Sequence, residues 1–140
     1  MLKCKERTIG EVATITNPAY ILAIVGTQLV KDYGLVKTII RYYVENTATI
    51  YPDLKVISGG ADGVDTIVKE VCGELEVGFA EYSPESPNWN GYKKRNRKIV
   101  EDCTELLVIR YKDNKSYGSG WTRDFAKQIG KKLVDIEIRE

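Results

Sequence analysis

The stretch VISGGADGVD, residues 56–65, decides the fold of this chain. An apolar run typical of a buried strand breaks into a Gly-Gly-Ala-Asp-Gly turn, and a helix-like pattern follows. Glycines allow a tight turn and let a ligand approach the main chain, and the N–H groups at the start of a helix attract anions. The stretch therefore fits a phosphate-binding turn. It also fits a structural connector between a strand and a helix.

Length and charge limit the classes of protein that remain. A chain of 140 residues with 43% apolar content fits one compact domain with a single core. A formal net charge of +1 provides no overall attraction to nucleic acid or to a membrane surface. Residues 1–10 are too polar for a signal peptide, and charges interrupt every long apolar run. We expect a cytoplasmic protein that makes no membrane contact.

The composition also restricts the chemistry. Cys4, Cys72 and Cys103 lie far apart, so neither a zinc site nor a disulfide framework is indicated and reduced thiols are expected. The chain has no histidine, which excludes histidine-based triads and proton shuttles. We predict no metal and no cofactor. Any catalysis would use carboxylates, hydroxyls, lysine or cysteine.

Apolar periodicity alternates between strand and helix along the chain. Strands are predicted at residues 20–26, 54–58, 77–82, 106–111 and 133–138. Helical spacing separates them; the third helix is expected to begin near Gly91, and the fourth has an apolar face that includes Ile129. This alternation predicts a Rossmann-like α/β three-layer sandwich, with a mostly parallel sheet of about five strands and helices on both faces. Residues 20–140 form the single domain, and residues 1–19 are an N-terminal extension in which 12–16 fit an edge strand.

Polar residues gather where the predicted strands end, which is where ligands bind to parallel sheets. Gly26 and Thr27 end the first strand, and Ser58, Gly59 and Gly60 end the second. The hydroxyls of Thr27 and Ser58 are candidate donors to phosphate or ribose.

Three carboxylates accompany this edge. Asp65 lies in the first turn of the second helix, where it either accepts a hydrogen bond from ribose or stabilises the helix dipole. Asp62, in the turn itself, is predicted to be the N-cap of that helix. Glu81 lies near the end of the third strand.

The segment YKKRNRK, residues 92–98, contains five cations in seven residues. Such a run is typical of a solvated helix face. Arg95 is a candidate for bidentate phosphate binding. The helical register places Tyr92 and Asn96 on the buried side, so Asn96 needs a polar partner, either a ligand or the glycine turn.

A second Gly/Ser loop, DNKSYGSG at residues 113–120, opens the last helix. It fits a phosphate-binding loop and a plain connector equally well. Ser119 and Thr122 supply candidate hydroxyls. Trp121 either packs in the core or stacks on a base.

Four motifs in order, VGT (25–27), ISGGADGVD (57–65), RN (95–96) and GSGWT (118–122), resemble the SLOG superfamily of Rossmann-like domains. Two branches are similar: the stand-alone YspA/YpsA-related proteins, and the DNA-processing protein A (DprA) family, whose RNR motif matches residues 95–97. The resemblance covers residues 20–138 and implies a pocket for a nucleotide or a nucleotide-derived ligand, and a homodimer. The ligand-binding residues that this reasoning predicts are Gly26, Thr27, Ser58, Gly59, Gly60, Ala61, Gly63, Asp65, Arg95, Asn96, Gly118, Ser119, Gly120 and Thr122.

The chain also departs from the pattern. SLOG proteins commonly have an arginine after the first strand, where this chain has Thr27 and Gln28. The phosphoribohydrolase branch has a glutamate at the position of Phe125, so its full catalytic set is absent.

Three functions remain open at this point. The first is binding of a nucleotide or nucleotide derivative without catalysis. The second is hydrolysis of an N-glycosidic bond, for which Glu81 and Asp65 are the candidate catalytic carboxylates. The third is binding of single-stranded DNA, in which the cations of residues 93–98 contact phosphates and Trp89, Tyr92 or Trp121 stacks on bases.

Overall fold

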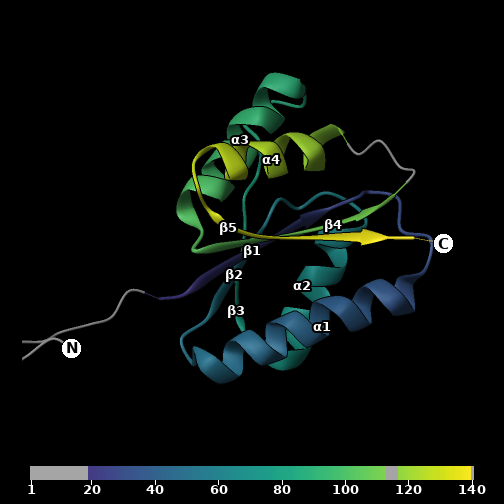
Figure 1. The fold of residues 1–140 in the computed structure, drawn as a ribbon, viewed down its shortest axis with the longest axis vertical. Coiled ribbons are helices and arrows are strands. Elements are labelled where there is room, and N and C mark those ends of the chain that lie inside the picture. Colours follow the sequence, from purple (N-terminus) through teal and green to yellow (C-terminus); the bar gives the residue numbers. More distant parts are fainter. Residues whose placement is uncertain (1–18, 113–116, 140) are drawn as a thin grey trace, which may run out of the picture.

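The sheet of this protein has five strands, all parallel, in the order β3-β2-β1-β4-β5. The computed structural model describes residues 19–112 and 117–139. The strands are β1 (Ile21–Gly26), β2 (Lys55–Ser58), β3 (Gly78–Glu81), β4 (Glu105–Tyr111) and β5 (Lys132–Ile138). The predicted Rossmann-like sheet is therefore confirmed (Figure 1). The predicted edge strand at residues 12–16 and Cys4 lie outside the described residues.

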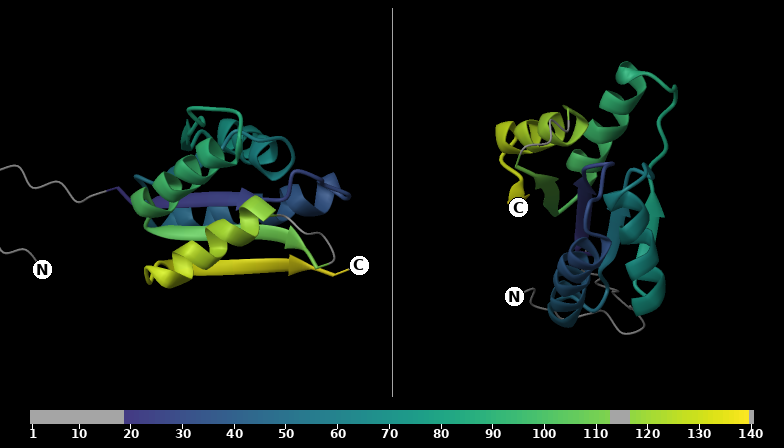
Figure 2. Two further views of the ribbon diagram at one scale, coloured as in Figure 1. Left: turned by 90° about the horizontal axis from the view of Figure 1, so that it is seen from above. Right: turned by 90° about the vertical axis from the view of Figure 1, so that its right-hand side faces the viewer.

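The helices form the two outer layers. They are α1 (Tyr33–Ile50), α2 (Val64–Leu75), α3 (Trp89–Asp102) and α4 (Tyr117–Gln128). As the right-hand view of Figure 2 shows, α1 and α2 cover one face of the sheet, while α3 and α4 cover the other. Helices on both faces bury both sides of the central strands.

Consecutive residues of β1 reach the two cores in turn, because side chains alternate across a strand. Leu22 and Ile24 pack in the core with α1 and α2. Ala23 and Val25 pack in the core with α3 and α4. The first strand is apolar at consecutive positions because helices cover both of its faces.

Two helix ends differ from the prediction. Helix α3 begins at Trp89 rather than near Gly91, because the Asn88 side chain caps it and accepts a hydrogen bond from the Gly91 N–H at 3.0 Å. Helix α4 ends at Gln128, one residue before Ile129. Ile129 is 44% exposed and does not belong to a buried face, since the chain turns there at Gly130 with a φ of 74°.

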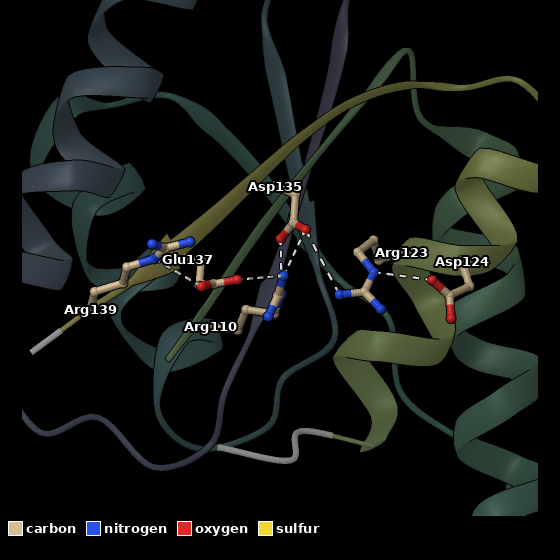
Figure 3. Close-up of polar contacts among 6 residues, drawn as sticks. All are labelled: Arg110, Arg123, Asp124, Asp135, Glu137 and Arg139. Carbon is tan, nitrogen blue, oxygen red and sulfur yellow. Dashed lines mark hydrogen bonds and ion pairs between the residues drawn. The ribbon is translucent and has the colours of Figure 1, made fainter. Parts of the chain in front are cut away.

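A row of alternating charges ties α4 to the last two strands (Figure 3). Arg110 of β4 makes two hydrogen bonds of 3.0 Å to the Asp135 carboxylate of β5. Arg123 of α4 approaches the same carboxylate at 3.8 Å. Bidentate arginine–carboxylate pairs are stronger than most ion pairs near a surface. The Arg110–Asp135 pair therefore links β4 to β5, and Arg123 adds a longer ion pair from α4 to the same carboxylate.

No helix within residues 19–112 and 117–139 combines the length and the apolar content that a membrane span requires.

Candidate functional site

A pocket of about 530 Å³ lies at the carboxyl edge of the sheet. Segments that are far apart in the sequence meet there: the loops after three neighbouring strands, the first two turns of α3 and the first turn of α4. Its lining is Gln28, Gly59, Gly60, Ala61, Asp62, Pro84, Trp89, Tyr92, Arg95, Asn96 and Gly118. Six of the predicted ligand-binding residues are in this lining: Gly59, Gly60, Ala61, Arg95, Asn96 and Gly118.

The glycine turn after β2 is fixed from two sides. Gly60 has a φ of 76°, and a Cβ atom there would lie 2.5 Å from Cδ of Glu81. Gly63 has a φ of 82°, and a Cβ atom there would lie 2.4 Å from the carbonyl oxygen of Gln28. At Gly63 both the positive φ and the backbone contact require glycine, whereas at Gly60 the positive φ favours glycine and the neighbouring atoms belong to a flexible side chain. The turn is therefore held between the end of β3 and the loop after β1.

Gly63, not Asp62, is the N-cap of α2, and it makes no side-chain cap. The prediction for Asp62 is wrong because the chain reaches the helix through the positive φ of Gly63. Asp62 lines the pocket instead.

The buried Asp65 side chain makes a hydrogen bond to the backbone of the glycine turn. It is 6% exposed, and its Oδ2 accepts a hydrogen bond from the Ala61 N–H at 3.1 Å. Its Oδ1 is buried without a hydrogen-bond partner. Burial raises the pKa of this carboxyl to about 6, against the opposing effects of the Ala61 N–H, the Ser58 hydroxyl and the Arg95 charge. Asp65 therefore supports the turn from behind and is not part of the pocket lining.

Arg95 joins three parts of the site. Its Nη1 donates to the carbonyl oxygens of Gly59 and, at 3.2 Å, of Tyr82. Its Nε donates to Oδ1 of Asn96 at 2.8 Å. Burial lowers the pKa of the guanidinium, while the Asp65 carboxylate opposes that shift. Arg95 thus connects the glycine turn, the end of β3 and helix α3, and two of its nitrogens donate within the protein.

Asn96 is buried, as the helical register predicts. Its hydrogen-bond partner is its neighbour Arg95, rather than the glycine turn. Tyr92, predicted on the same buried side, is 39% exposed. That prediction is wrong because Tyr92 lies at the pocket, with the Arg95 guanidinium carbon 5.6 Å from the centre of its ring.

Several predicted binding residues have structural partners and lie outside the lining. Ser58 donates its hydroxyl to the carbonyl oxygen of Ile24 at 2.8 Å, and the Thr27 hydroxyl bonds the backbone of Leu29. A Cβ atom on Gly26 would lie 2.4 Å from the carbonyl oxygen of Ile109, so this glycine permits close packing against β4. These residues shape the edge on which the pocket rests.

Residues 113–116 of the second loop lie outside the described residues, and the described part contributes less than its sequence suggests. Of its predicted residues, Gly118 lines the pocket. The Thr122 hydroxyl donates to the carbonyl oxygen of Gly118 at 2.7 Å, and Ser119 is buried. Ser119, Gly120 and Thr122 do not belong to the lining.

Other lining residues escaped the sequence analysis. Gln28 and Pro84 also line the pocket, and no motif in the sequence marks either of them as a binding residue. The loop that carries Gln28 is positioned by Tyr111, whose hydroxyl accepts hydrogen bonds from the N–H groups of Lys31 at 2.9 Å and Asp32 at 3.1 Å. Tyr111 belongs to β4, so only the folded sheet reveals this support.

Aromatic and cationic side chains continue from the pocket along α3 and α4. Trp89 meets Trp121 edge to face at 6.0 Å between ring centres, and Trp121 stacks on Phe125 at 5.3 Å. Lys93 lies 5.8 Å from the centre of the Trp121 ring, and Arg97 lies 5.2 Å from that of Phe125. We call these five residues the aromatic–cation row. Trp121 therefore belongs to a surface cluster rather than to either fully buried core.

Within the described ranges, no group of three or more acidic or cysteine side chains is arranged to hold a metal ion. Cys72 and Cys103 are free and buried, and burial raises their pKa values to about 12 and about 11.

No protein-family model and no curated protein matches this sequence. The structure is similar to the X-ray structure of TM1055, a structural genomics target, with a TM-score of 0.63 and 17% identity over 81% of this chain and 72% of that one. It is also similar to DNA processing protein A (DprA) from Streptococcus pneumoniae, with a TM-score of 0.54 and 16% identity over 83% of this chain. The alignment spans 58% of that DprA chain. This chain therefore has the Rossmann-like α/β fold that these two solved structures share.

Proposed function

We propose that the pocket binds a nucleotide or a nucleotide-derived molecule. The observation that carries this proposal is the composition of one cavity, which combines a glycine turn, two aromatic rings and a buried amide. A base has a flat face that stacks on rings such as Trp89 and Tyr92. A phosphate or sugar fits against residues 59–61, which line the pocket between the end of β2 and the start of α2.

Isothermal titration calorimetry against a panel of nucleosides, nucleotides and dinucleotides tests this proposal. Tyr92→Ala is the informative variant, because loss of a stacking ring weakens binding by about five- to 150-fold. Tyr51→Ala is the matched control: each tyrosine is 39% exposed, and Tyr51 stacks on Tyr20 rather than lining the pocket. A panel without a single binder, or equal affinity in Tyr92→Ala and wild type, would overturn the proposal.

Glu81 keeps hydrolysis of an N-glycosidic bond as an alternative. Its side chain packs against Gly60, a residue of the lining, so its carboxylate lies next to the pocket. Such hydrolysis needs a carboxylate near the anomeric carbon of the bound sugar. Asp65 is a poorer candidate because it is buried behind the turn. Release of free base by wild type but not by Glu81→Gln, measured by chromatography, would favour the enzyme; no release from any nucleotide that binds would rule it out.

The aromatic–cation row favours a second candidate function, binding of single-stranded DNA. Rings that stack on bases and cations that contact phosphates are the two components of such surfaces. The affinity for a single-stranded oligonucleotide, measured by fluorescence anisotropy, would then fall steeply as the salt concentration rises. At a fixed salt concentration, Arg97→Ala would bind more weakly than wild type. Binding that is insensitive to salt would contradict this alternative.

A further inference from the structure

The backbone donors of the first glycine turn are directed into the protein. The Ala61 N–H donates to Oδ2 of Asp65 at 3.1 Å. Burial raises the pKa of that carboxyl, and hydrogen bonds from the Ala61 and Gly59 backbones oppose this shift. The Val64 N–H, the first of α2, donates to the carbonyl oxygen of Thr27 at 3.1 Å. N–H groups of turns and helix starts are the donors that bind phosphate, and three of them are already engaged here.

The Asp65 carboxylate occupies the position of an anion at this turn. It is 6% exposed, and its Oδ1 has no hydrogen-bond partner among the described residues. A Cβ atom on Gly59 would lie 3.0 Å from Oδ2 of Asp65 and 2.9 Å from Cζ of Arg95, so both side chains pack against the turn at this residue. Solvent screens a buried charge only weakly. A phosphate placed at the turn would therefore be repelled by a carboxylate directly behind the backbone.

The other charges near the pocket add to this repulsion. Within residues 19–112 and 117–139, Arg95 is the only cation of the lining. Burial lowers the pKa of its guanidinium, and the nearby carboxylates of Asp65 and Glu81 oppose that shift. Asp62 lines the pocket as well and is exposed. One cation thus faces three carboxylates, which disfavours a phosphate group that carries a charge of about −1.5 to −2.

The two exposed carboxylates suit a ligand that donates hydrogen bonds. Glu81 packs against Gly60, and Asp62 follows two residues later in the same turn. An ionised carboxylate only accepts hydrogen bonds, and so does a phosphate oxygen that carries no proton, whereas a sugar hydroxyl donates. A hydroxyl beside either carboxylate would make a charge-assisted hydrogen bond. The exposed side of the turn therefore complements a sugar better than a phosphate.

We propose that the pocket selects a nucleoside over its phosphorylated forms, with the ribose hydroxyls at Asp62 and the base on the rings of Trp89 and Tyr92. This inference rests on the proposed function and narrows its ligand class. Asp65 sets the preference, because it supplies from within the negative charge that the glycine turn would otherwise take from a phosphate. The glycine motif by itself favours the opposite choice, a nucleotide.

Isothermal titration calorimetry at about pH 8, where Asp65 with a pKa of about 6 is ionised, compares each nucleoside that binds with its 5′-monophosphate. We expect the nucleoside to bind at least about tenfold more tightly, a difference of about 1.4 kcal/mol. Asp65→Asn keeps the shape of the side chain and removes one charge, so the preference should shrink by about threefold or more. Circular dichroism checks that the variant folds.

Asp102→Asn is the matched control. It also removes a carboxylate that accepts a hydrogen bond, from the Tyr82 hydroxyl at 2.7 Å. Asp102 is the last residue of α3, whereas the pocket lies at the first two turns of that helix. The preference for the nucleoside should therefore be the same in this variant as in wild type.

Removal of the ribose hydroxyls gives a second measurement. The 2′,3′-dideoxy form of the nucleoside should bind wild type about tenfold more weakly, because hydrogen bonds to a charged group are lost. In Asp62→Ala the two forms should differ much less. Equal binding of the two forms to wild type would contradict the placement of the ribose at Asp62.

The outcomes separate this inference from the proposed function. A 5′-monophosphate that binds as tightly as its nucleoside would overturn the inference and leave nucleotide binding in place. A preference of the same size in Asp65→Asn and Asp102→Asn would overturn the role of Asp65. A panel without any binder would contradict the proposed function, and this inference with it.

Discussion

The two glycine-rich loops of this protein have similar sequences and different structural roles. The first loop, residues 59–63, has two glycines with positive φ, and a Cβ atom on either would collide with a neighbour at 2.5 Å or less. Residues 118–120, in the described part of the second loop, lie within the first turn of α4, where a Cβ atom on Gly118 or Gly120 would meet its nearest atom at 3.8 or 4.0 Å. Glycine is thus required by geometry in the first loop and tolerated in the second.

The two loops are also secured by different chemistry. A buried carboxylate, Asp65, accepts a hydrogen bond from the first loop, whereas a hydroxyl, Thr122, donates to the second. Only the carboxylate titrates. The comparison therefore predicts differences in both the size and the pH dependence of substitution effects.

Gly63→Ala should have the largest effect. The new methyl group would need a positive φ and would lie 2.4 Å from a backbone oxygen, so we expect the free energy of unfolding to fall by about 3 kcal/mol or more. Urea denaturation followed by circular dichroism measures this fall. A fall of less than about 1 kcal/mol would show that the first loop can shift to accommodate a methyl group. Glycine would then be no more necessary in the first loop than in the second.

Asp65→Asn should alter the pH dependence of stability. The pKa of Asp65 is about 6 in the folded protein against an ordinary value of 3.8, so the folded state binds more protons between these two values. The contribution of Asp65 to the free energy of unfolding is therefore fully present below about pH 4 and is lost as pH rises through about 6.

The lost contribution is on the order of 3 kcal/mol. Denaturation curves from pH 4 to pH 7 should show that wild type loses stability relative to Asp65→Asn over this interval. Parallel pH profiles for the two proteins would mean that Asp65 is not buried as an acid behind the turn.

Thr122→Val should have a smaller effect. The substitution keeps the shape of the side chain and removes one hydrogen bond, so the free energy of unfolding should change by about 1 kcal/mol or less. The change should be the same at pH 4 and pH 7, because no titrating group is involved. A pH-dependent loss would show that the second loop is coupled to a carboxylate.

Gly120→Ala should be the mildest substitution and should stabilise the protein. Alanine is the better helix former by roughly 0.5 to 1 kcal/mol, and space is available for its methyl group. A rise in melting temperature of a few degrees is the expected result. Destabilisation would mean that geometry requires glycine at position 120, as it does at Gly63.

The parts of the fold and of the site that could be predicted from sequence are those that a local pattern determines. The strands and the two-sided burial follow from local apolar periodicity, which is why residues 20–26 lie so close to the observed β1. The first loop is predictable because Gly59, Gly60 and Ala61 lie between a strand and a helix that are both evident in the apolar pattern. Local pattern and fold agree in these places.

The errors arise where a distant part of the chain determines the local structure. Asp62 has the residue type of an N-cap, but the positive φ of Gly63, which lacks a Cβ and packs closely against the Gln28 carbonyl, changes the entry into α2. The Ser58 hydroxyl is suited to a ligand, yet it bonds to Ile24 of the neighbouring strand. Tyr92 fits the buried register of α3, yet it faces a pocket that exists only after β2 and β3 have paired. The start of α3, by contrast, was readable from Asn88, which is a common capping residue.

The order of the strands has a consequence for the kinetics of folding. Central strand β1 pairs with β4 through Leu22 and Glu105, and the chain between them contains two further strands and three helices. Contacts that close so long a loop form slowly, because the loss of chain entropy precedes the gain from packing. The units β1-α1-β2 and α2-β3 involve shorter closures. We therefore expect a folding transition state in which β1, β2, α1 and α2 are ordered and β4 has not yet paired with β1. The pocket is then one of the last features to form.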